Sequence, residues 1–293
     1  RRGPGRRLIR RPQTAMPIPL HDFGGAGPVL HLAGGNGFPP ETYRPLLQPL
    51  TARYHVVSLL PRPLWSDPPP PRSLSHWRQL AGDLLAGLRQ HGLSGVVAAG
   101  HSLGGVTSLL ATLAEPSRFR ALILLDPTLL PPRVLLGVRA MRRLGLAARL
   151  PLVQSALRRR AAFPSAAAAY EYWRGRPLFA EWPDETVQLY ARSMTEPDGS
   201  GSVRLAWPRE WEARVYETVP ADVWREVPQL EGLLPVLVVR GAETDTFSAA
   251  SARKFQAAVP SARMVVVEGH GHLFPHTAAE ETRAILEQWL AGL

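Results

Sequence analysis

A serine flanked by glycines is the residue of this sequence best suited to covalent chemistry. It is Ser102, in the run Gly100-His101-Ser102-Leu103-Gly104. The run follows the β-branched and small residues of Val96 to Ala99 and precedes a helical pattern. A sharp strand-to-helix turn strains the backbone of the serine, and the two glycines remove side chains that would clash. The pattern predicts that Ser102 is a nucleophile rather than part of a purely structural turn.

A serine hydroxyl needs a base to act as a nucleophile near neutral pH. The sequence has nine histidines. We predict His272 as the base, because it ends the run Gly269-His270-Gly271-His272 just after the last expected strand, where a loop can bring it over the sheet edge. His270 is the alternative, or else a loop residue that packs beneath the site. His101 adjoins the serine, and we expect it to pack or bond locally.

A third group must orient the base. We predict Asp245, in Gly241-Ala-Glu-Thr-Asp245, because it follows the expected strand Val236 to Arg240 at the carboxyl edge of the sheet. Asp126 is the main rival, since it ends the expected strand Ala121 to Leu125, although it can also cap the turn before Pro127. Glu243 remains a third choice.

Two backbone N–H groups are expected to receive an oxyanion. The first belongs to Leu103, at the positive end of the helix behind the serine. The second comes from the small-residue loop Ala33-Gly-Gly-Asn-Gly-Phe38, whose backbone can approach a substrate closely. We predict Asn36 as this donor, with Phe38 as the second choice. Read more simply, the segment is an ordinary glycine loop.

No metal site and no cofactor are predicted. The chain has no cysteine, which excludes disulfides, thiolate metal sites and a catalytic thiol. The histidines His270, His272 and His276 lie close together, but no nearby carboxylate pattern supports a metal site.

Short apolar runs and helical patterns alternate along the chain, which predicts a mostly parallel sheet with helices on both faces. The expected strands are Val29 to Ala33, His55 to Leu59, Val96 to Ala99, Ala121 to Leu125, Val236 to Arg240 and Met264 to Val267. The expected helices are Tyr43 to Ala52, Leu74 to His91, Leu103 to Ala114, Ala249 to Ala258 and Ala278 to Leu293.

The alternation stops over residues 131–228, which we predict to be a helical cap insertion. Helices are expected at Leu135 to Leu152 and Ser155 to Tyr172, with their arginines, including Arg159, on solvated faces. The insertion holds five of the eight tryptophans, namely Trp173, Trp182, Trp207, Trp211 and Trp224. These form either the core of a small subdomain or a lid over an apolar cavity. Residues 16–130 and 229–293 then make up the core domain.

The formal charge of +10 at pH 7 raises nucleic acid as a partner. Six arginines, however, lie in residues 1–15, which we predict to be a disordered basic tail, and the remainder carries about +4 (10 minus 6). Nucleic-acid binding is therefore not expected. The uncharged stretch from Gly92 to Ala114 divides into a strand, a glycine turn and a helix, so no membrane span is expected. We expect a cytoplasmic protein and take Met16 as a sensible start. The oligomeric state stays open.

With these motifs in place, the sequence from Pro28 to Leu293 resembles the α/β-hydrolase superfamily, in the branch of capped serine esterases and cofactor-free haloperoxidase-like proteins. The order Ser102, Asp245, His272 matches the nucleophile, acid and base order of the family. The resemblance implies an eight-stranded, mainly parallel sheet and acyl transfer to water through an acyl-serine. The usual His-Gly before the oxyanion loop is replaced by Gly34-Gly35.

The expected function is hydrolysis of a small-molecule carboxylic ester with a small or medium apolar acyl group. The same three residues would also suit hydrolysis of a carbon–carbon bond or acyl transfer to an alcohol. A protein of another class, a non-catalytic relative that binds a ligand under the cap, would usually lack one of the three residues.

Overall fold

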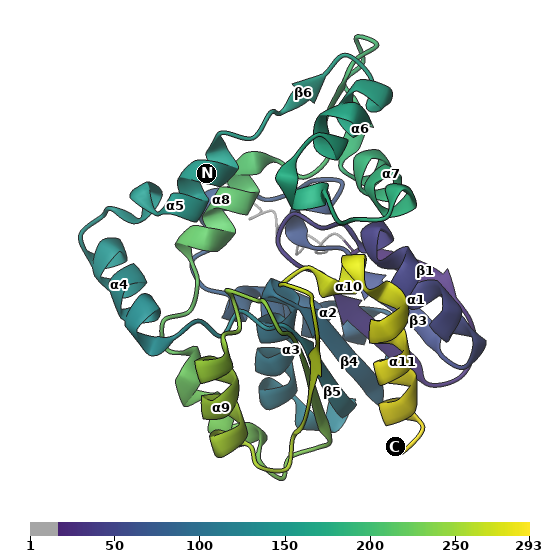
Figure 1. The fold of residues 1–293 in the computed structure, drawn as a ribbon, viewed down its shortest axis with the longest axis vertical. Coiled ribbons are helices and arrows are strands. Elements are labelled where there is room, and N and C mark those ends of the chain that lie inside the picture. The colour runs from purple at the N-terminus through teal and green to yellow at the C-terminus, as the bar shows by residue number, and fades with distance from the viewer. Residues whose placement is uncertain (1–16) are drawn as a thin grey trace, which may run out of the picture.

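A seven-stranded sheet forms the centre of the molecule in the computed structural model, which describes residues 17–293. The strand order is β1-β3-β2-β4-β5-β9-β10, and every strand is parallel to its neighbours except the edge strand β1, which pairs antiparallel with β3. Figure 1 shows helices packed around this sheet and a further group of elements gathered at one end of it. The predicted α/β class is confirmed.

All six predicted strands are present. They are β2 (Val29–Ala33), β3 (His55–Leu59), β4 (Val96–His101), β5 (Phe119–Leu125), β9 (Val236–Gly241) and β10 (Arg263–Val267). The additional strand β1 (Leu20–Gly24) was not predicted, because His21, Asp22 and Gly24 interrupt its apolar pattern. The described residues thus form seven strands in this sheet, where the family resemblance implied eight.

Side chains of successive strand residues point to opposite faces of the sheet and enter two separate cores. In β4, Val96 and Ala98 pack with α2 and α3, whereas Val97 and Ala99 pack with α1 and α11. These helices are α1 (Arg44–Leu47), α2 (Arg78–Gln90), α3 (Leu103–Ala114) and α11 (Ala279–Leu290), and α9 (Ala249–Ala258) covers the same face as α2 and α3. Burial on both faces explains why β4 is apolar from Val96 to Ala99.

The helix predicted from Tyr43 to Ala52 is broken into short pieces. The four-residue α1 is flanked by 3-10 turns at Pro40–Tyr43 and Gln48–Ala52. Pro40, Pro45 and Pro49 occupy the first or second position of the three pieces. Because proline cannot donate a backbone hydrogen bond, each piece starts afresh at its proline.

The segment between β5 and β9 contains five helices and a small antiparallel sheet. The helices are α4 (Pro132–Arg143), α5 (Pro151–Leu157), α6 (Ala166–Arg174), α7 (Asp184–Ser193) and α8 (Arg209–Glu217). The sheet, with the order β6-β8-β7, consists of β6 (Ala162–Phe163), β7 (Thr195–Pro197) and β8 (Val203–Leu205). It was not predicted, and the helix expected from Ser155 to Tyr172 is wrong, because the chain extends into β6 between α5 and α6.

Arg159 in this segment is also not on a solvated face. It lies between α5 and β6, forms an ion pair with the buried Glu212 of α8, and donates a 2.6 Å hydrogen bond to the hydroxyl of Tyr190. The residue pairs with a carboxylate because burying an unpaired guanidinium would be costly.

Within residues 17–293, no helix combines the length and the apolar character needed to cross a bilayer. The predicted basic tail and Met16 lie outside the described residues.

Candidate active site

The sheet brings Ser102 to the turn between β4 and α3. Its backbone has φ 55° and ψ −116°, a left-handed conformation that is rare for a residue with a side chain. A methyl group on Gly100 would lie 2.2 Å from the carbonyl oxygen of Gly104, and one on Gly104 would lie 2.0 Å from that of Ala33. Both glycines are therefore required for the tight approach of α3 to β4 and to the end of β2.

The turn lies at the point where the strand order reverses. From β2 the chain continues to β3 on one side of β2 and then to β4 on the other side. The loops that follow β2 and β4 therefore run in opposite directions, which leaves a crevice at the carboxyl ends of these two strands. Such crevices are the usual ligand sites of open α/β sheets. The glycine loop after β2 and Ser102 after β4 both face this crevice.

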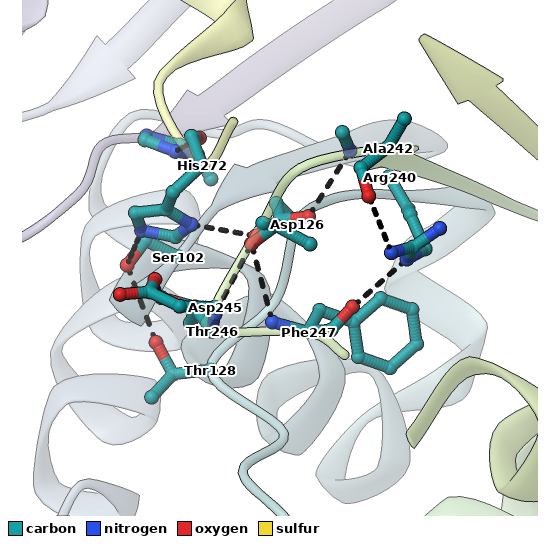
Figure 2. A network of polar contacts seen from close by, with 12 residues as sticks. Ser102, Asp126, Thr128, Arg240, Ala242, Asp245, Thr246, Phe247 and His272 are labelled. Atoms are coloured by element: carbon teal, nitrogen blue, oxygen red, sulfur yellow. Dashed lines mark hydrogen bonds and ion pairs between the residues drawn. The ribbon is translucent and has the colours of Figure 1, made fainter. Parts of the chain in front are cut away.

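His272 makes the predicted contact with the serine. Its Nε2 lies 2.9 Å from Oγ of Ser102, within hydrogen-bonding distance. Figure 2 shows the imidazole between Ser102 and Asp126. The alternative base, His270, instead bonds through Nδ1 to the hydroxyl of Thr277 at 3.0 Å.

The predicted contact between His272 and Asp245 is wrong, and Asp126 takes its place. Nδ1 of His272 lies 2.6 Å from Oδ2 of Asp126 (Figure 2). Asp245 is exposed and its carboxylate accepts a hydrogen bond from the hydroxyl of Thr246 at 3.2 Å. Glu243 is also exposed. The rival that the sequence left open is therefore the carboxylate that orients the histidine.

Asp126 is held by contacts that leave it little freedom. It is fully buried and has φ 42°, a second left-handed residue beside Ser102. Its carboxylate accepts a 2.5 Å bond from the hydroxyl of Thr244 and a 3.3 Å bond from the Gly241 N–H, in addition to the contact with His272. These donors satisfy the hydrogen-bonding capacity that the buried carboxylate would otherwise lose.

Backbone hydrogen bonds also connect Ser102 directly to the end of β5 and to the residues that follow Asp126. The Ser102 N–H donates to the carbonyl of Leu125 at 3.0 Å, and the Thr128 N–H donates to the carbonyl of Ser102 at 3.2 Å. The Thr128 hydroxyl lies 3.2 Å from Oγ of Ser102. Sequence reasoning missed Thr128, although its position two residues after Asp126 placed it at the same strand end.

Two of the three oxyanion donors considered from the sequence have free N–H groups. In the described part of the chain, no protein acceptor bonds the N–H of Leu103 or of Asn36. The N–H of Phe38, in contrast, donates to the carbonyl of Gly35 at 3.2 Å and closes a type II turn with Gly37 at φ 81°. Phe38 is thus excluded as a donor, because its N–H is already used.

The side chain of Asn36 fixes the turn against α8. Its Nδ2 donates to the carbonyl of Glu212 at 3.0 Å. A methyl group on Gly37 would come within 3.3 Å of the Arg159 guanidinium. The inserted segment therefore positions the loop that carries the candidate oxyanion donor.

A chain of polar contacts through His101 links this loop to the histidine. The Gly35 N–H donates to the Tyr43 hydroxyl at 2.8 Å, that hydroxyl lies 2.8 Å from Nδ1 of His101, and Nε2 of His101 lies 3.0 Å from the carbonyl of His272. Burial lowers the pKa of His101 well below its usual value, with the nearby His272 and His276 adding to this. A neutral imidazole fits this chain, with Nδ1 accepting from Tyr43 and Nε2 donating to His272. The local bonding predicted for His101 is confirmed.

The histidines near the site do not form a metal centre. Residues 17–293 contain no group of three or more histidine and carboxylate side chains with metal-binding geometry. His276 is buried, bonds to the carbonyl of Thr42 at 3.2 Å, and stacks on Trp182 with ring centroids 4.4 Å apart.

The tryptophans of the insertion mostly form its core. Trp173, Trp182, Trp207 and Trp211 are buried among other apolar residues. Trp207 has a second role, because it lines a cavity of about 70 Å³ that Gly34, Gly35 and Leu103 also border. Leu59, Leu80 and Leu84 contribute further apolar surface to this cavity. Of the two alternatives left open by the sequence, the subdomain core applies to all four of these tryptophans, and the cavity wall applies to Trp207 as well.

The sheet is mainly parallel, the serine lies on a strained strand-to-helix turn, and the loop after the last strand brings the histidine to it. This combination defines the α/β-hydrolase fold. A family model described as the alpha/beta hydrolase family matches residues 29–285. The chain belongs to this family.

Solved structures show the same fold at low sequence identity. An E-2-(acetamidomethylene)succinate hydrolase is 21% identical, with a TM-score of 0.76 over 93% of this chain and 94% of that one. The thioesterase domain of the curacin biosynthetic pathway is 17% identical, with a TM-score of 0.67 over 91% and 93%. The enol-lactonase of Burkholderia xenovorans is 18% identical, with a TM-score of 0.64 over 93% and 95%. A comparison with curated protein sequences gave no match.

Proposed function

We propose that this protein is a serine hydrolase that cleaves carboxylic esters of small to medium apolar acyl groups. The observation that carries the proposal is the hydrogen-bonded series Ser102 Oγ, His272 Nε2 at 2.9 Å, and Asp126 Oδ2 at 2.6 Å from His272 Nδ1. A nucleophile, a base and an orienting carboxylate in this order are the requirements for acyl transfer through a covalent intermediate.

In the first half-reaction, Nε2 of His272 takes the proton of Ser102 while Oγ forms a bond to the ester carbonyl carbon. The negative charge that develops on the carbonyl oxygen is stabilised by the N–H groups of Leu103 and Asn36. The histidine then gives its proton to the departing alcohol as the carbon–oxygen bond breaks. Asp126 keeps Nδ1 protonated and stabilises the imidazolium throughout.

In the second half-reaction a water molecule replaces the alcohol. His272 takes a proton from the water, the hydroxyl oxygen bonds to the acyl carbon, and the bond to Ser102 breaks with return of the proton to Oγ. The products are the free acid and the original enzyme. No cofactor enters either half-reaction.

The cavity beside the oxyanion loop supports the choice of apolar acyl groups. Its volume of about 70 Å³ suits a short chain, and most of its wall is aliphatic or aromatic. Its charged residues, Arg62 and Asp83, pair with each other at 2.5 and 3.0 Å. A charged acyl group would therefore lose hydration without gaining a free partner.

Labelling with a fluorophosphonate tests the nucleophile. The wild-type protein should be labelled at Ser102, and Ser102→Ala should abolish labelling and lower ester turnover by several orders of magnitude while leaving the fold intact. Full activity in a folded Ser102→Ala protein would refute the proposal.

A panel of esters tests the acyl group. The kcat/KM of the wild-type protein should rise from acetyl to butyryl esters, by at most about 0.8 kcal/mol for each buried CH₂. A matched succinyl ester should be poor. A flat profile or a preference for the succinyl ester would contradict the apolar pocket without affecting the nucleophile. Labelling of Ser102 without ester hydrolysis would favour carbon–carbon bond cleavage or acyl transfer.

A further inference from the structure

The segment that follows Asp126 is unusually basic. From Pro127 to Tyr170 the sequence contains no aspartate or glutamate, and it contains eight arginines: Arg133, Arg139, Arg142, Arg143, Arg149, Arg158, Arg159 and Arg160. This segment comprises α4, α5, β6 and the first part of α6, and Figure 1 shows α4 and α5 at the edge of the molecule, away from the central sheet. The charge is therefore concentrated on one part of the surface.

Apolar side chains protrude from the same segment. Leu144 is 70% exposed, Leu136 is 67% exposed and Leu152 is 57% exposed, and these are the three most exposed large apolar side chains among residues 17–293. These three leucines contribute to neither of the two large cores, so packing does not explain their position on one segment.

Leu136 shares the outward face of α4 with two arginines. Leu136, Arg139 and Arg143 are spaced i, i+3 and i+7, which places them in one row, and all three are exposed. Leu135, by contrast, is buried and anchors the inward face. The inner face of α4 is therefore apolar, as expected of a helix that packs on a protein core. Its outer face is charged but also carries the apolar side chain of Leu136.

An open cleft continues the basic surface. It has a volume of about 460 Å³ and is lined by Arg139, Arg142, Arg143 and Arg225, together with His76, Ala221 and Asp222. Asp222 faces His76 at 3.7 Å, and Arg142 donates to the carbonyl of Val219 at 3.2 Å. Across the described chain, no carboxylate forms an ion pair with Arg139, Arg143 or Arg225, so these three guanidiniums are available to an external anion.

We propose that the face formed by α4, the turn after it and the start of α5 docks on an anionic lipid surface, with Leu136, Leu144 and Leu152 entering the interface and the arginines of the cleft binding lipid phosphates. Charge complementarity selects an anionic partner, and the leucines select a lipid surface over nucleic acid, whose phosphate backbone offers no apolar layer. Guanidinium groups bind phosphate oxygens in a bidentate manner.

A fluorescent label at one position tests the orientation of docking. The sequence has no cysteine, so Leu144→Cys provides a unique site for an environment-sensitive dye such as nitrobenzoxadiazole. With vesicles of phosphatidylglycerol and phosphatidylcholine the emission should shift to the blue and increase several-fold. Leu233→Cys is the control, because Leu233 is 38% exposed and lies in the loop just before β9, outside the segment of α4 and α5. An unchanged signal at position 144, or equal responses at both positions, would overturn the proposal.

A pair of charge variants tests the arginines. Since each arginine near an anionic surface contributes about 1 kcal/mol, Arg139→Gln/Arg143→Gln should weaken vesicle binding on the order of 20- to 30-fold. The control Arg120→Gln/Arg263→Gln removes the same charge from exposed residues at the starts of β5 and β10 and should leave the affinity unchanged.

The basic residues 1–15 remain in every variant. If they alone bound the vesicles, the two double variants would bind equally well, which would contradict the proposal. Absence of vesicle binding by the wild-type protein would do the same and would favour an acidic protein partner. Neither measurement depends on ester hydrolysis, so the outcome is independent of the proposed function.

Discussion

The carboxylate that orients the base is the residue at which sequence and structure differ most. Asp245 and Asp126 both follow strands of the sheet, and both lie at its carboxyl edge. What separates them is side-chain direction and burial: Asp126 is fully buried and bonds to His272, whereas Asp245 is exposed. The sequence pattern shows where each carboxylate lies along the chain, but it does not show in which direction the side chain points.

Exchanging each carboxylate for an amide distinguishes the two. Asp126→Asn should lower kcat on the order of 10³- to 10⁴-fold, because an amide no longer holds the Nδ1 proton of His272 in place. Asp245→Asn should leave kcat within experimental error. Both are measured on an ester substrate, with circular dichroism to verify folding. Greater damage from Asp245→Asn would require another arrangement of the site in solution.

Ser102 and Asp126, the two non-glycine residues with positive φ among residues 17–293, were not equally visible in the sequence. The glycines on either side of Ser102 indicate a strained turn at this residue. Asp126 has no such flanking signal, since Leu125 and Pro127 adjoin it. Aspartate tolerates the left-handed region better than most residues, but what favoured Asp126 beforehand was its position at the end of the expected strand Ala121 to Leu125.

At the scale of elements, the parallel strands could be predicted because buried strands have a continuous apolar pattern. The strands Val29–Ala33 and His55–Leu59 have the predicted bounds, and so does the helix Leu103–Ala114. The insertion could not be predicted equally well, since its short helices and strands are held by contacts between distant residues. The bond from Asn36 to the carbonyl of Glu212 is an example, because 176 positions separate the two residues.

The contacts of His101 give a prediction about how elements are aligned. Tyr43→Phe removes the hydroxyl that joins the Gly35 N–H to His101. The oxyanion loop should loosen, and kcat should fall about tenfold while KM changes little, because the lost contact acts on the developing charge. The shape of the pH profile of kcat should stay the same, since the bonds of His272 to Ser102 and Asp126 remain.

A surface tyrosine provides the matched control for this variant. Tyr54→Phe removes a hydroxyl from a partly exposed residue just before β3 and should not change kcat. If Tyr43→Phe raised KM and left kcat unaltered, Tyr43 would act on substrate binding and not on the alignment of the loop.

At the scale of the whole molecule, three buried histidines make stability depend on pH. Burial lowers the pKa of His31 to about 4 and of His276 to about 3, and it lowers the pKa of His101 well below its usual value. The unfolded chain takes up protons on these residues below pH 6.5, while the folded protein does not. Protonation therefore favours the unfolded state, and stability is lost as the pH falls from 6.5 towards 4.

The loss can be measured by denaturant unfolding between pH 6.5 and 5. Each histidine contributes up to about 1.4 kcal/mol per pH unit, so the three together contribute at most about 4 kcal/mol per pH unit. His276→Asn should reduce the slope by up to one third of that. The carboxyls of the half-buried Asp83 and the buried Glu212 have pKa values raised by burial, so they act in the opposite direction. Their effect is the same in the wild-type protein and in the variant, and it cancels in the comparison. An equal slope in the variant would show that His276 takes up its proton while folded.

The position of Asp126 directly after β5 has a consequence for protein engineering. Ser102 and Asp126 are joined through backbone bonds between adjacent strands, and only His272 arrives on a separate loop. In the proposed mechanism residues 242–248 therefore contribute no catalytic side chain, although Thr244 supports Asp126. Asp245 lines an open cleft with Leu130 and Pro131, so this loop offers protein designers a place to introduce side chains and alter the range of accepted substrates while the reacting groups stay where they are.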